Sequence, residues 1–343
     1  MQTRFSSTSE SYLSVENSTT SEVSREFPRS TNWRDALSKD VDAGANATLD
    51  QRKLFTTVDH ATPTYVTNTD FWLKGYEQAF TCRAPYSGES GDNLKLTTAV
   101  TPRHAVSAWH SGYTPDVGTT VRFVTTDNTV IERTVVQQSS QLTWNDPISG
   151  PVDTDIGVIL LDSDLPSTIT PCKIFPSSYR NVLHDVDQTS NSGTWSNIVD
   201  RIEKPRIALV ACGQEHKTHP FTHQTFRPQR SFYDKIWATY YAIENSSLYD
   251  FPHDQVAVNY PSWKRTWGRW FVKPENAVAG DSGNPIFCAV NKELWLVSTF
   301  FLSSSGPFYA NLIPELNAAI AALDTAQGID TGYTVTEGNL LDL

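Results

Sequence analysis

The sequence of 343 residues lacks several features that would assign it to a common class of protein. No apolar run approaches the roughly 20 residues that a helix needs to cross a bilayer, so we expect no membrane span. The start of the chain lacks the charged end and apolar core of a secretory signal, which predicts a cytoplasmic or virion-associated location. The four cysteines are scattered without the spacing of a metal site, and we expect neither a metal nor a cofactor.

Positive charge is also scarce. The chain has 27 lysines and arginines against 38 aspartates and glutamates, and its net charge of −11 disfavours contact with phosphate backbones. We therefore expect no nucleic-acid partner. Large side chains are plentiful, because ten tryptophans contribute to an aromatic content of 11%. A chain of this length and composition suits two packed units better than one small domain.

From Asp70 onward, short apolar or alternating runs are separated by Gly, Pro, Asn and Ser. This pattern predicts an all-β sandwich or barrel rather than βαβ units. The expected strands span residues 94–100, 120–125, 130–136, 156–161, 206–211, 255–258, 284–290, 294–300 and 308–312. One helix is expected over residues 313–323, with Pro314 at its start and Leu316, Ile320 and Leu323 on one face.

Three short motifs supply a base, a carboxylate and a nucleophile in that order. His110 ends Val-Ser-Ala-Trp-His, Asp155 opens Asp-Ile-Gly-Val-Ile-Leu-Leu, and Ser282 lies in Gly-Asp-Ser-Gly-Asn-Pro. A serine hydroxyl is a poor nucleophile unless an imidazole takes its proton, and a buried carboxylate must orient that imidazole. Each motif alone also fits a plain structural role in a turn or at a strand end, but their joint order favours a catalytic triad.

Together the motifs resemble those of the trypsin/chymotrypsin-like serine proteases of the PA clan. The segment around Ser282 is similar to that family's Gly-Asp-Ser-Gly-Gly-Pro, with Asn284 in place of a glycine. The interval from His110 to Asp155 is 45 residues (155 − 110), close to the family's, whereas the interval to Ser282 is 127 (282 − 155) and longer than in compact members. The resemblance covers roughly residues 75 to 323. It implies two packed antiparallel six-stranded β-barrels with a C-terminal helix.

The resemblance implies a serine endopeptidase that cleaves a polypeptide substrate through an acyl-enzyme. Ser282 would be the nucleophile, His110 the general base, and Asp155 the residue that orients it. The oxyanion hole would consist of the backbone N–H groups of Gly280 and Ser282. His104 lies six residues before His110 and is expected to be structural.

The resemblance also implies where a substrate would bind. Asn276 falls at the base of the specificity pocket, the strand that binds the substrate backbone includes Ser298, Thr299 and Phe300, and the far wall of the pocket falls near Tyr309. Because no acidic residue lies at the base, we expect a neutral side chain rather than Arg or Lys before the cleaved bond.

The long interval predicts an aromatic-rich insertion over about residues 180–268, within a double barrel of residues 61–323. A packed subdomain is the favoured interpretation of the insertion, and its His216, His219 and His223 have too few neighbouring ligands to favour a metal. Residues 1–60 are expected to form a Ser/Thr-rich, partly flexible arm, and residues 324–343 a C-terminal extension. Either end could bind an assembly partner.

An alternative of a different class stays open: a non-enzymatic binding or structural protein of a virion or surface assembly, built on a protease fold. Phe300 favours it, because relatives often have glycine at this position and its ring could fill the pocket. An esterase or a self-cleaving processing module is a third interpretation. Cys212 and Cys288 could be buried thiols or a bridge.

Overall fold

The computed structural model describes residues 40, 50–51, 53–90, 93–146, 150–178, 206–215, 231–244, 255–257, 282–300 and 305–340. By internal contacts the chain divides into residues 1–30 and residues 31–343, and every described residue belongs to the second unit. The two expected segments around Asn276 and Gly280 lie outside the described ranges, as do His216, His219 and His223 and most of the expected arm and insertion.

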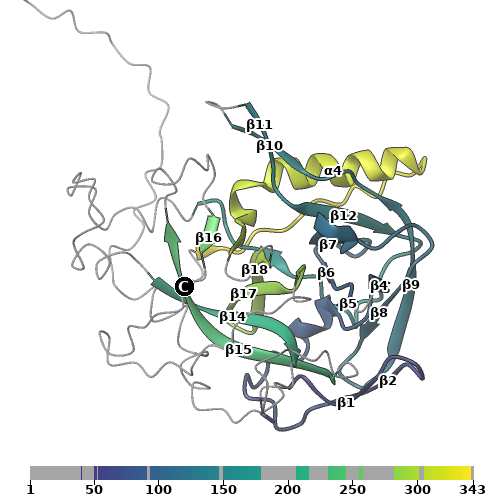
Figure 1. Ribbon diagram of the computed structural model, residues 1–343, viewed down its shortest axis with the longest axis vertical. Coiled ribbons are helices and arrows are strands. Elements are labelled where there is room, and N and C mark those ends of the chain that lie inside the picture. The colour runs from purple at the N-terminus through teal and green to yellow at the C-terminus, as the bar shows by residue number, and fades with distance from the viewer. Residues whose placement is uncertain are drawn as a thin grey trace, which may run out of the picture. The chain divides into compact units, whose positions relative to one another are not determined.

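A six-stranded antiparallel sheet forms the first half of the described fold (Figure 1). Its order is β3-β6-β7-β12-β9-β8, with β3 Arg83–Ala84, β6 Thr97–Ala99, β7 His104–Ala108, β8 Thr120–Val124, β9 Val130–Gln138 and β12 Ile156–Leu161. A bridge between Tyr86 and Arg122 brings the two edges together, so the sheet is nearly closed and barrel-like. Every residue of β12 is buried, as its unbroken apolar run predicts for a strand covered on both faces.

A second sheet has the order β13-β18-β17-β14-β15-β16-β19. Its strands are β13 Lys173–Ile174, β14 Arg206–Glu215, β15 Ser231–Glu244, β16 Gln255–Ala257, β17 Pro285–Val290, β18 Glu293–Thr299 and β19 Ser305–Pro307. All neighbours are antiparallel except β13 and β18. The mostly-β fold is thus confirmed with one barrel-like sheet, and a second barrel is not shown by the described residues.

The remaining elements are hairpins and short helices. The hairpins are β1 Phe55–Asp59 with β2 Thr64–Thr67, β4 Glu89–Ser90 with β5 Asn93–Leu94, and β10 Thr143–Asp146 with β11 Gly150–Asp153. Single 3-10 turns span Ala79–Cys82 (η1), His110–Gly112 (η2) and Tyr309–Asn311 (η3). β1 begins within the stretch that the sequence assigned to an N-terminal arm, and Phe55 and Val58 are buried.

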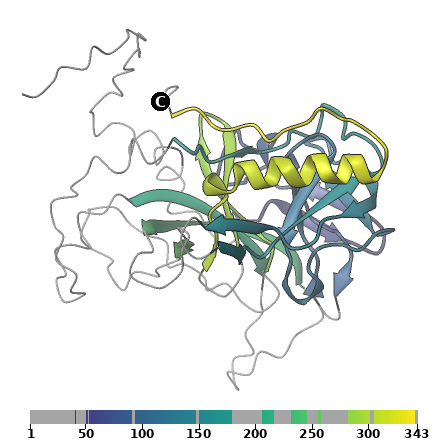
Figure 2. The same cartoon turned by 90° about the horizontal axis from the view of Figure 1, so that it is seen from above.

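The expected C-terminal helix is present as α4, Ile313–Ala326. Its buried residues include Leu316, Ile320 and Leu323, the three predicted from their spacing, and the helix packs on β12. The chain then doubles back along the helix (Figure 2), and the backbone N–H of Val335 donates to Asn317 Oδ1 (2.9 Å). Within the described residues no helix is long and apolar enough to cross a membrane.

Residues 336–338 of the C-terminal extension cover the edge of β13. Ile174 N–H donates to the carbonyl oxygen of Thr336 (2.7 Å), and Gly338 N–H donates to that of Ile174 (2.9 Å). A Cβ atom on Gly338 would lie 2.3 Å from the ring of Trp295, so only glycine allows this close approach. This part of the extension therefore binds its own chain at a position where an open sheet edge would invite another strand.

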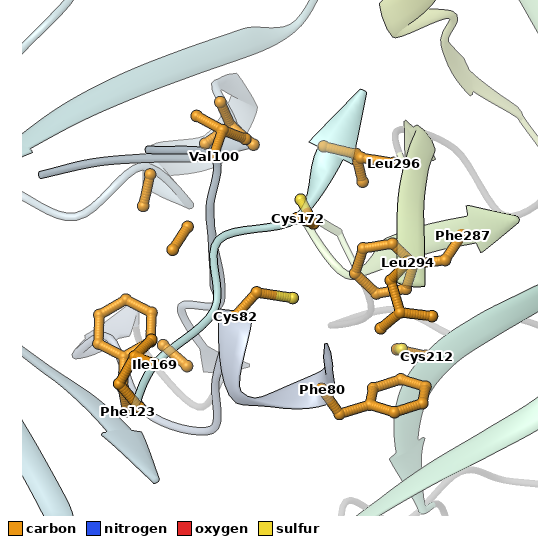
Figure 3. Close-up of a cluster of buried hydrophobic side chains, with 14 of the residues drawn as sticks. Phe80, Cys82, Val100, Phe123, Ile169, Cys172, Cys212, Phe287, Leu294 and Leu296 are labelled. Atoms are coloured by element: carbon orange, nitrogen blue, oxygen red, sulfur yellow. The ribbon is translucent and has the colours of Figure 1, made fainter. Parts of the chain in front are cut away.

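One apolar core joins the two sheets. In Figure 3, Phe80 and Cys82 from η1 meet Phe287, Leu294 and Leu296 from β17 and β18. Phe80 and Phe287 stack edge to face with ring centroids 6.0 Å apart. Since edge-to-face pairs add to the stabilisation from area burial, this contact helps to fix the second sheet against the first.

Candidate active site

Strand pairing places His110 beside Asp155. Ala108, the last residue of β7, pairs with Ile156, the first residue of β12. Because the strands are antiparallel, the chain that leaves β7 lies next to the chain that enters β12, and Trp109 N–H donates to the carbonyl oxygen of Asp155 (3.0 Å). The two motifs therefore meet at one end of the first sheet.

The Asp155 carboxylate binds His110 twice. Its Oδ1 accepts the backbone N–H of His110 (2.7 Å), and its Oδ2 lies 2.7 Å from His110 Nδ1. Asp155 is only 5% exposed, and its backbone has φ 60°, a conformation that aspartate tolerates better than most residues. A carboxylate can only accept, so the proton of a neutral imidazole lies on Nδ1 and leaves Nε2 with a lone pair.

The loop after His110 is held against both strands. Thr114 Oγ1 donates to the carbonyl oxygen of Ala108 (2.8 Å), and the rings of Tyr113 and His110 lie 5.3 Å apart. A Cβ atom on Gly157 would lie 2.1 Å from Thr114 Oγ1, which explains the glycine in the motif that Asp155 opens. The imidazole is thus positioned from the ring side as well as from Nδ1.

Ser282 completes a continuous line of hydrogen bonds. Its Oγ lies 2.9 Å from His110 Nε2, although the two residues are 172 positions apart. The expected convergence of His110, Asp155 and Ser282 is therefore present in the geometry. A serine hydroxyl donating to Nε2 while Nδ1 donates to a carboxylate is the arrangement that proton abstraction from the serine requires.

The turn after Ser282 is fixed by backbone bonds and by a close approach. Gly283 N–H donates to the carbonyl oxygen of Phe300 (2.9 Å), and Phe300 N–H donates to that of Asn284 (3.0 Å). Gly283 has φ 83°, and a Cβ atom there would lie 2.8 Å from Ser107 Oγ. Glycine is needed here both for its backbone conformation and for the approach of the turn to β7.

The residues expected to bind substrate are buried. Ser298 and Thr299 are 0% and 1% exposed, and Phe300 is 3% exposed. Gly306 of β19 packs directly on them, since a Cβ atom there would lie 1.8 Å from the carbonyl oxygen of Thr299. Substrate contacts at these three residues stay a prediction, as do the roles of Asn276 and Gly280.

Tyr309 is an element of the site that the sequence indicated only as part of a pocket wall. Its hydroxyl lies 3.3 Å from Thr299 Oγ1 in a fully buried position. Burial raises the pKa of Tyr309 well above its usual value, and the negative charge of Asp155 adds to this effect. The buried phenol thus packs against the strand that was expected to bind substrate.

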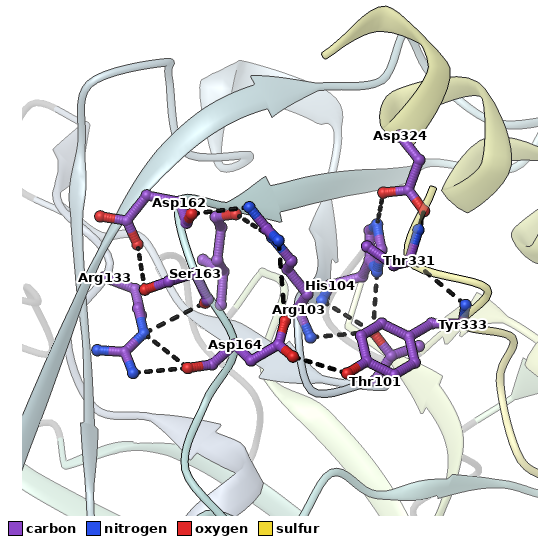
Figure 4. A network of polar contacts seen from close by, with 11 residues as sticks. Thr101, Arg103, His104, Arg133, Asp162, Ser163, Asp164, Asp324, Thr331 and Tyr333 are labelled. Carbon is purple, nitrogen blue, oxygen red and sulfur yellow. Dashed lines mark hydrogen bonds and ion pairs between the residues drawn. The ribbon is translucent and has the colours of Figure 1, made fainter. Parts of the chain in front are cut away.

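His104 belongs to a different network, at the opposite end of β7 (Figure 4). Its Nε2 lies 3.1 Å from Asp324 Oδ1 in α4, and its Nδ1 lies 2.8 Å from Thr101 Oγ1. Asp324 in turn accepts the side-chain hydroxyl of Thr331. These bonds tie the first sheet to the helix and to the extension that follows it.

The remaining candidate groups are thiols and metal ligands. All four cysteines are buried and none forms a disulfide, so Cys212 and Cys288 are thiols and not a bridge. Across the described ranges, no group of three or more His, Cys, Asp or Glu residues is arranged to hold a metal ion.

No family model matches the chain, and no curated protein sequence matches it significantly.

Proposed function

We propose that this chain is a serine hydrolase that cleaves peptide bonds through Ser282, His110 and Asp155. The observation that carries the proposal is the unbroken series from Asp155 Oδ2 through both ring nitrogens of His110 to Ser282 Oγ, with steps of 2.7 and 2.9 Å. Three side chains from distant segments meet in the order that nucleophilic catalysis needs, with each ring nitrogen of His110 facing one partner.

In the proposed reaction, Ser282 Oγ attacks the substrate carbonyl carbon while His110 Nε2 takes the hydroxyl proton. The imidazolium then gives this proton to the leaving amine, which departs as the acyl-enzyme ester forms. Water repeats the sequence: His110 takes its proton, the hydroxyl adds to the ester carbonyl, and Ser282 leaves with the proton returned. Asp155, held by two hydrogen bonds, stabilises the imidazolium in both halves.

The proposed fold is the chymotrypsin-like double barrel. The nearly closed first sheet supports it, as do the positions of His110 just after β7, of Asp155 just before β12 and of Ser282 before β17 of the other sheet. The contact of β19 with both β16 and β18 is the kind that closure of the second sheet would need. The proposed substrate is a polypeptide with a neutral side chain before the cleaved bond.

The test is covalent labelling with a fluorophosphonate probe, read by intact mass and peptide mapping. We expect one adduct on Ser282, lost on heating the protein beforehand. Ser282→Ala should abolish it, and His110→Ala should slow it by orders of magnitude, since loss of either residue in a triad costs about 10⁶-fold in turnover. A folded protein that takes up no label would contradict the proposal.

Burial of Phe300 favours a second candidate, a non-enzymatic binding or structural protein on the same fold. If Phe300 keeps substrate from the segment beside Ser282, the side chains of the triad persist without turnover. Phe300→Gly separates the two candidates. Labelling that appears only in this variant points to a blocked site, whereas equal labelling in wild type and variant supports the hydrolase.

A further inference from the structure

Arg83 is among the largest fully buried side chains in the described part of the molecule, with 2% of its surface exposed. It lies at the start of β3, where it pairs with Thr98 of β6. Its Nη2 donates to Oδ1 of Asn284 at 2.8 Å, across 201 positions of sequence. A residue of the first sheet thus contacts the segment that carries Ser282.

Asn284 is held at both its backbone and its side chain. Its carbonyl oxygen accepts the N–H of Phe300 (3.0 Å), its side-chain oxygen accepts from Arg83, and it is 0% exposed. It is separated from Ser282 only by Gly283, whose N–H is also bound to Phe300. A shift of Asn284 would therefore be passed directly to the turn that sets the position of Ser282 Oγ.

The buried guanidinium of Arg83 requires a hydrogen-bond acceptor, which Asn284 supplies. A guanidinium stays charged at any pH of interest, and a buried charge must be hydrogen-bonded to be tolerated. A bond from a charged donor is shorter and stronger than one between neutral groups. Asn284 offers an amide oxygen where the family resemblance has glycine, which offers no side chain. The pair is therefore a feature of this chain that the resemblance does not imply.

We propose that Arg83 is a positioning residue: through Asn284 it holds Ser282 Oγ within reach of His110 Nε2. The inference rests on the proposed hydrolase function and extends it to a residue of the first sheet. Displacement of a reacting group by about 1 Å can cost about 100-fold in rate, so loss of the contact should be visible in the reactivity of Ser282.

The experiment measures the second-order rate constant for fluorophosphonate labelling in the full chain. Arg83→Met and Asn284→Gly should each label about 100-fold more slowly than wild type. Asn284→Asp keeps an oxygen acceptor for the guanidinium and should label at close to the wild-type rate. Arg83→Lys keeps the charge but not the planar fork and should recover little.

Two controls distinguish the positioning of Ser282 from a general effect of Arg83 on stability. The double variant Arg83→Met/Asn284→Leu removes both polar groups, so it should fold as stably as wild type yet still label slowly. Leu316→Ala in α4 destabilises the core elsewhere and should label at the wild-type rate while folded. If labelling instead follows thermal stability through the whole set, or the double variant labels like wild type, the inference is wrong.

The pH profile adds a second readout. Positioning predicts a lower plateau of labelling rate in Arg83→Met, and a plateau equal to that of wild type would contradict the inference. If wild type itself takes up no label, the proposed function fails. The positioning role is then tested by the ¹⁵N shift of His110 Nε2, which should move in Arg83→Met and not in Leu316→Ala; an unchanged shift in Arg83→Met overturns it.

Discussion

At the scale of single residues, Gly283 combines a left-handed backbone conformation with close contacts to β7. Its φ of 83° is unfavourable for residues with a side chain, and an added Cβ would meet Ser107 Oγ at 2.8 Å and the backbone nitrogen of Ala108 at 3.1 Å. Gly118 has a similar φ of 89°, but a Cβ there would meet nothing within 4 Å. Substituting alanine at Gly118 therefore measures the energetic cost of the backbone conformation alone. The same substitution at Gly283 adds the cost of steric contact.

We therefore expect Gly118→Ala to lower the free energy of unfolding by about 1–2 kcal/mol, the cost of a left-handed conformation. Gly283→Ala should cost a further ~1–3 kcal/mol, because the turn must move away from β7. It should also slow labelling of Ser282. Urea unfolding of both variants checks this, and equal losses would show that the turn relaxes freely.

The chemical groups of the site could be predicted from sequence, but their supports could not. His110, Asp155 and Ser282 were identified because each lies in a short motif and their order matches one mechanism. Arg83 carries no local signal, because its partner Asn284 lies 201 positions away in the sequence. Tyr309 was expected only near a pocket wall, and its contact with Thr299 was not evident from the sequence. Asn284 was noted as a departure from the family pattern without its partner being evident.

At the scale of elements, the contact between His104 of β7 and Asp324 of α4 should make stability depend on pH. Burial lowers the pKa of His104, while the nearby carboxylate of Asp324 opposes this shift. A histidine with a lowered pKa in the folded state binds a proton more readily when the chain is unfolded. Stability is therefore complete above the unfolded value of about 6.5 and is lost as pH falls toward the lower folded value.

We expect the free energy of unfolding to fall by up to about 1.4 kcal/mol per pH unit below about pH 6.5 from this residue. His104→Gln removes the titration and should flatten the dependence in that window. Asp324→Asn removes the opposing carboxylate and should steepen it. Urea titrations between pH 4 and 8 make the comparison, and identical slopes for wild type and His104→Gln would count against the assignment.

Eight of the nine expected apolar runs contain a strand, but β7 and β15 were not among the expected strands. The run 156–161 matches β12, and the runs at 120–125 and 284–290 match β8 and β17 within one residue. The strand expected over residues 308–312 was wrong. This segment forms a 3-10 turn that ends just before α4 begins. The β10–β11 hairpin was missed, since its strands are short and polar.

At the scale of the whole molecule, the four thiols report on the core. All are buried, and burial raises the pKa of Cys82 and of Cys288 far above the usual range, so neither is a reactive thiolate. We expect no reaction with Ellman's reagent in the native protein and four thiols per chain in guanidinium. Reducing agents should leave the melting temperature unchanged. Fewer than four thiols in the unfolded chain would mean that a bridge forms.

The long separations in sequence have a consequence for the order in which these contacts form during folding. The bond between His110 and Ser282 spans 172 positions, that of Arg83 with Asn284 spans 201, and that of His104 with Asp324 spans 220. Closing such loops costs entropy before any contact repays it, so these bonds should form after the local hairpins. A refolding chain should regain its circular dichroism before Ser282 becomes reactive. A nascent chain with the proposed activity would therefore pass through most of its synthesis and early folding unable to cleave its neighbours.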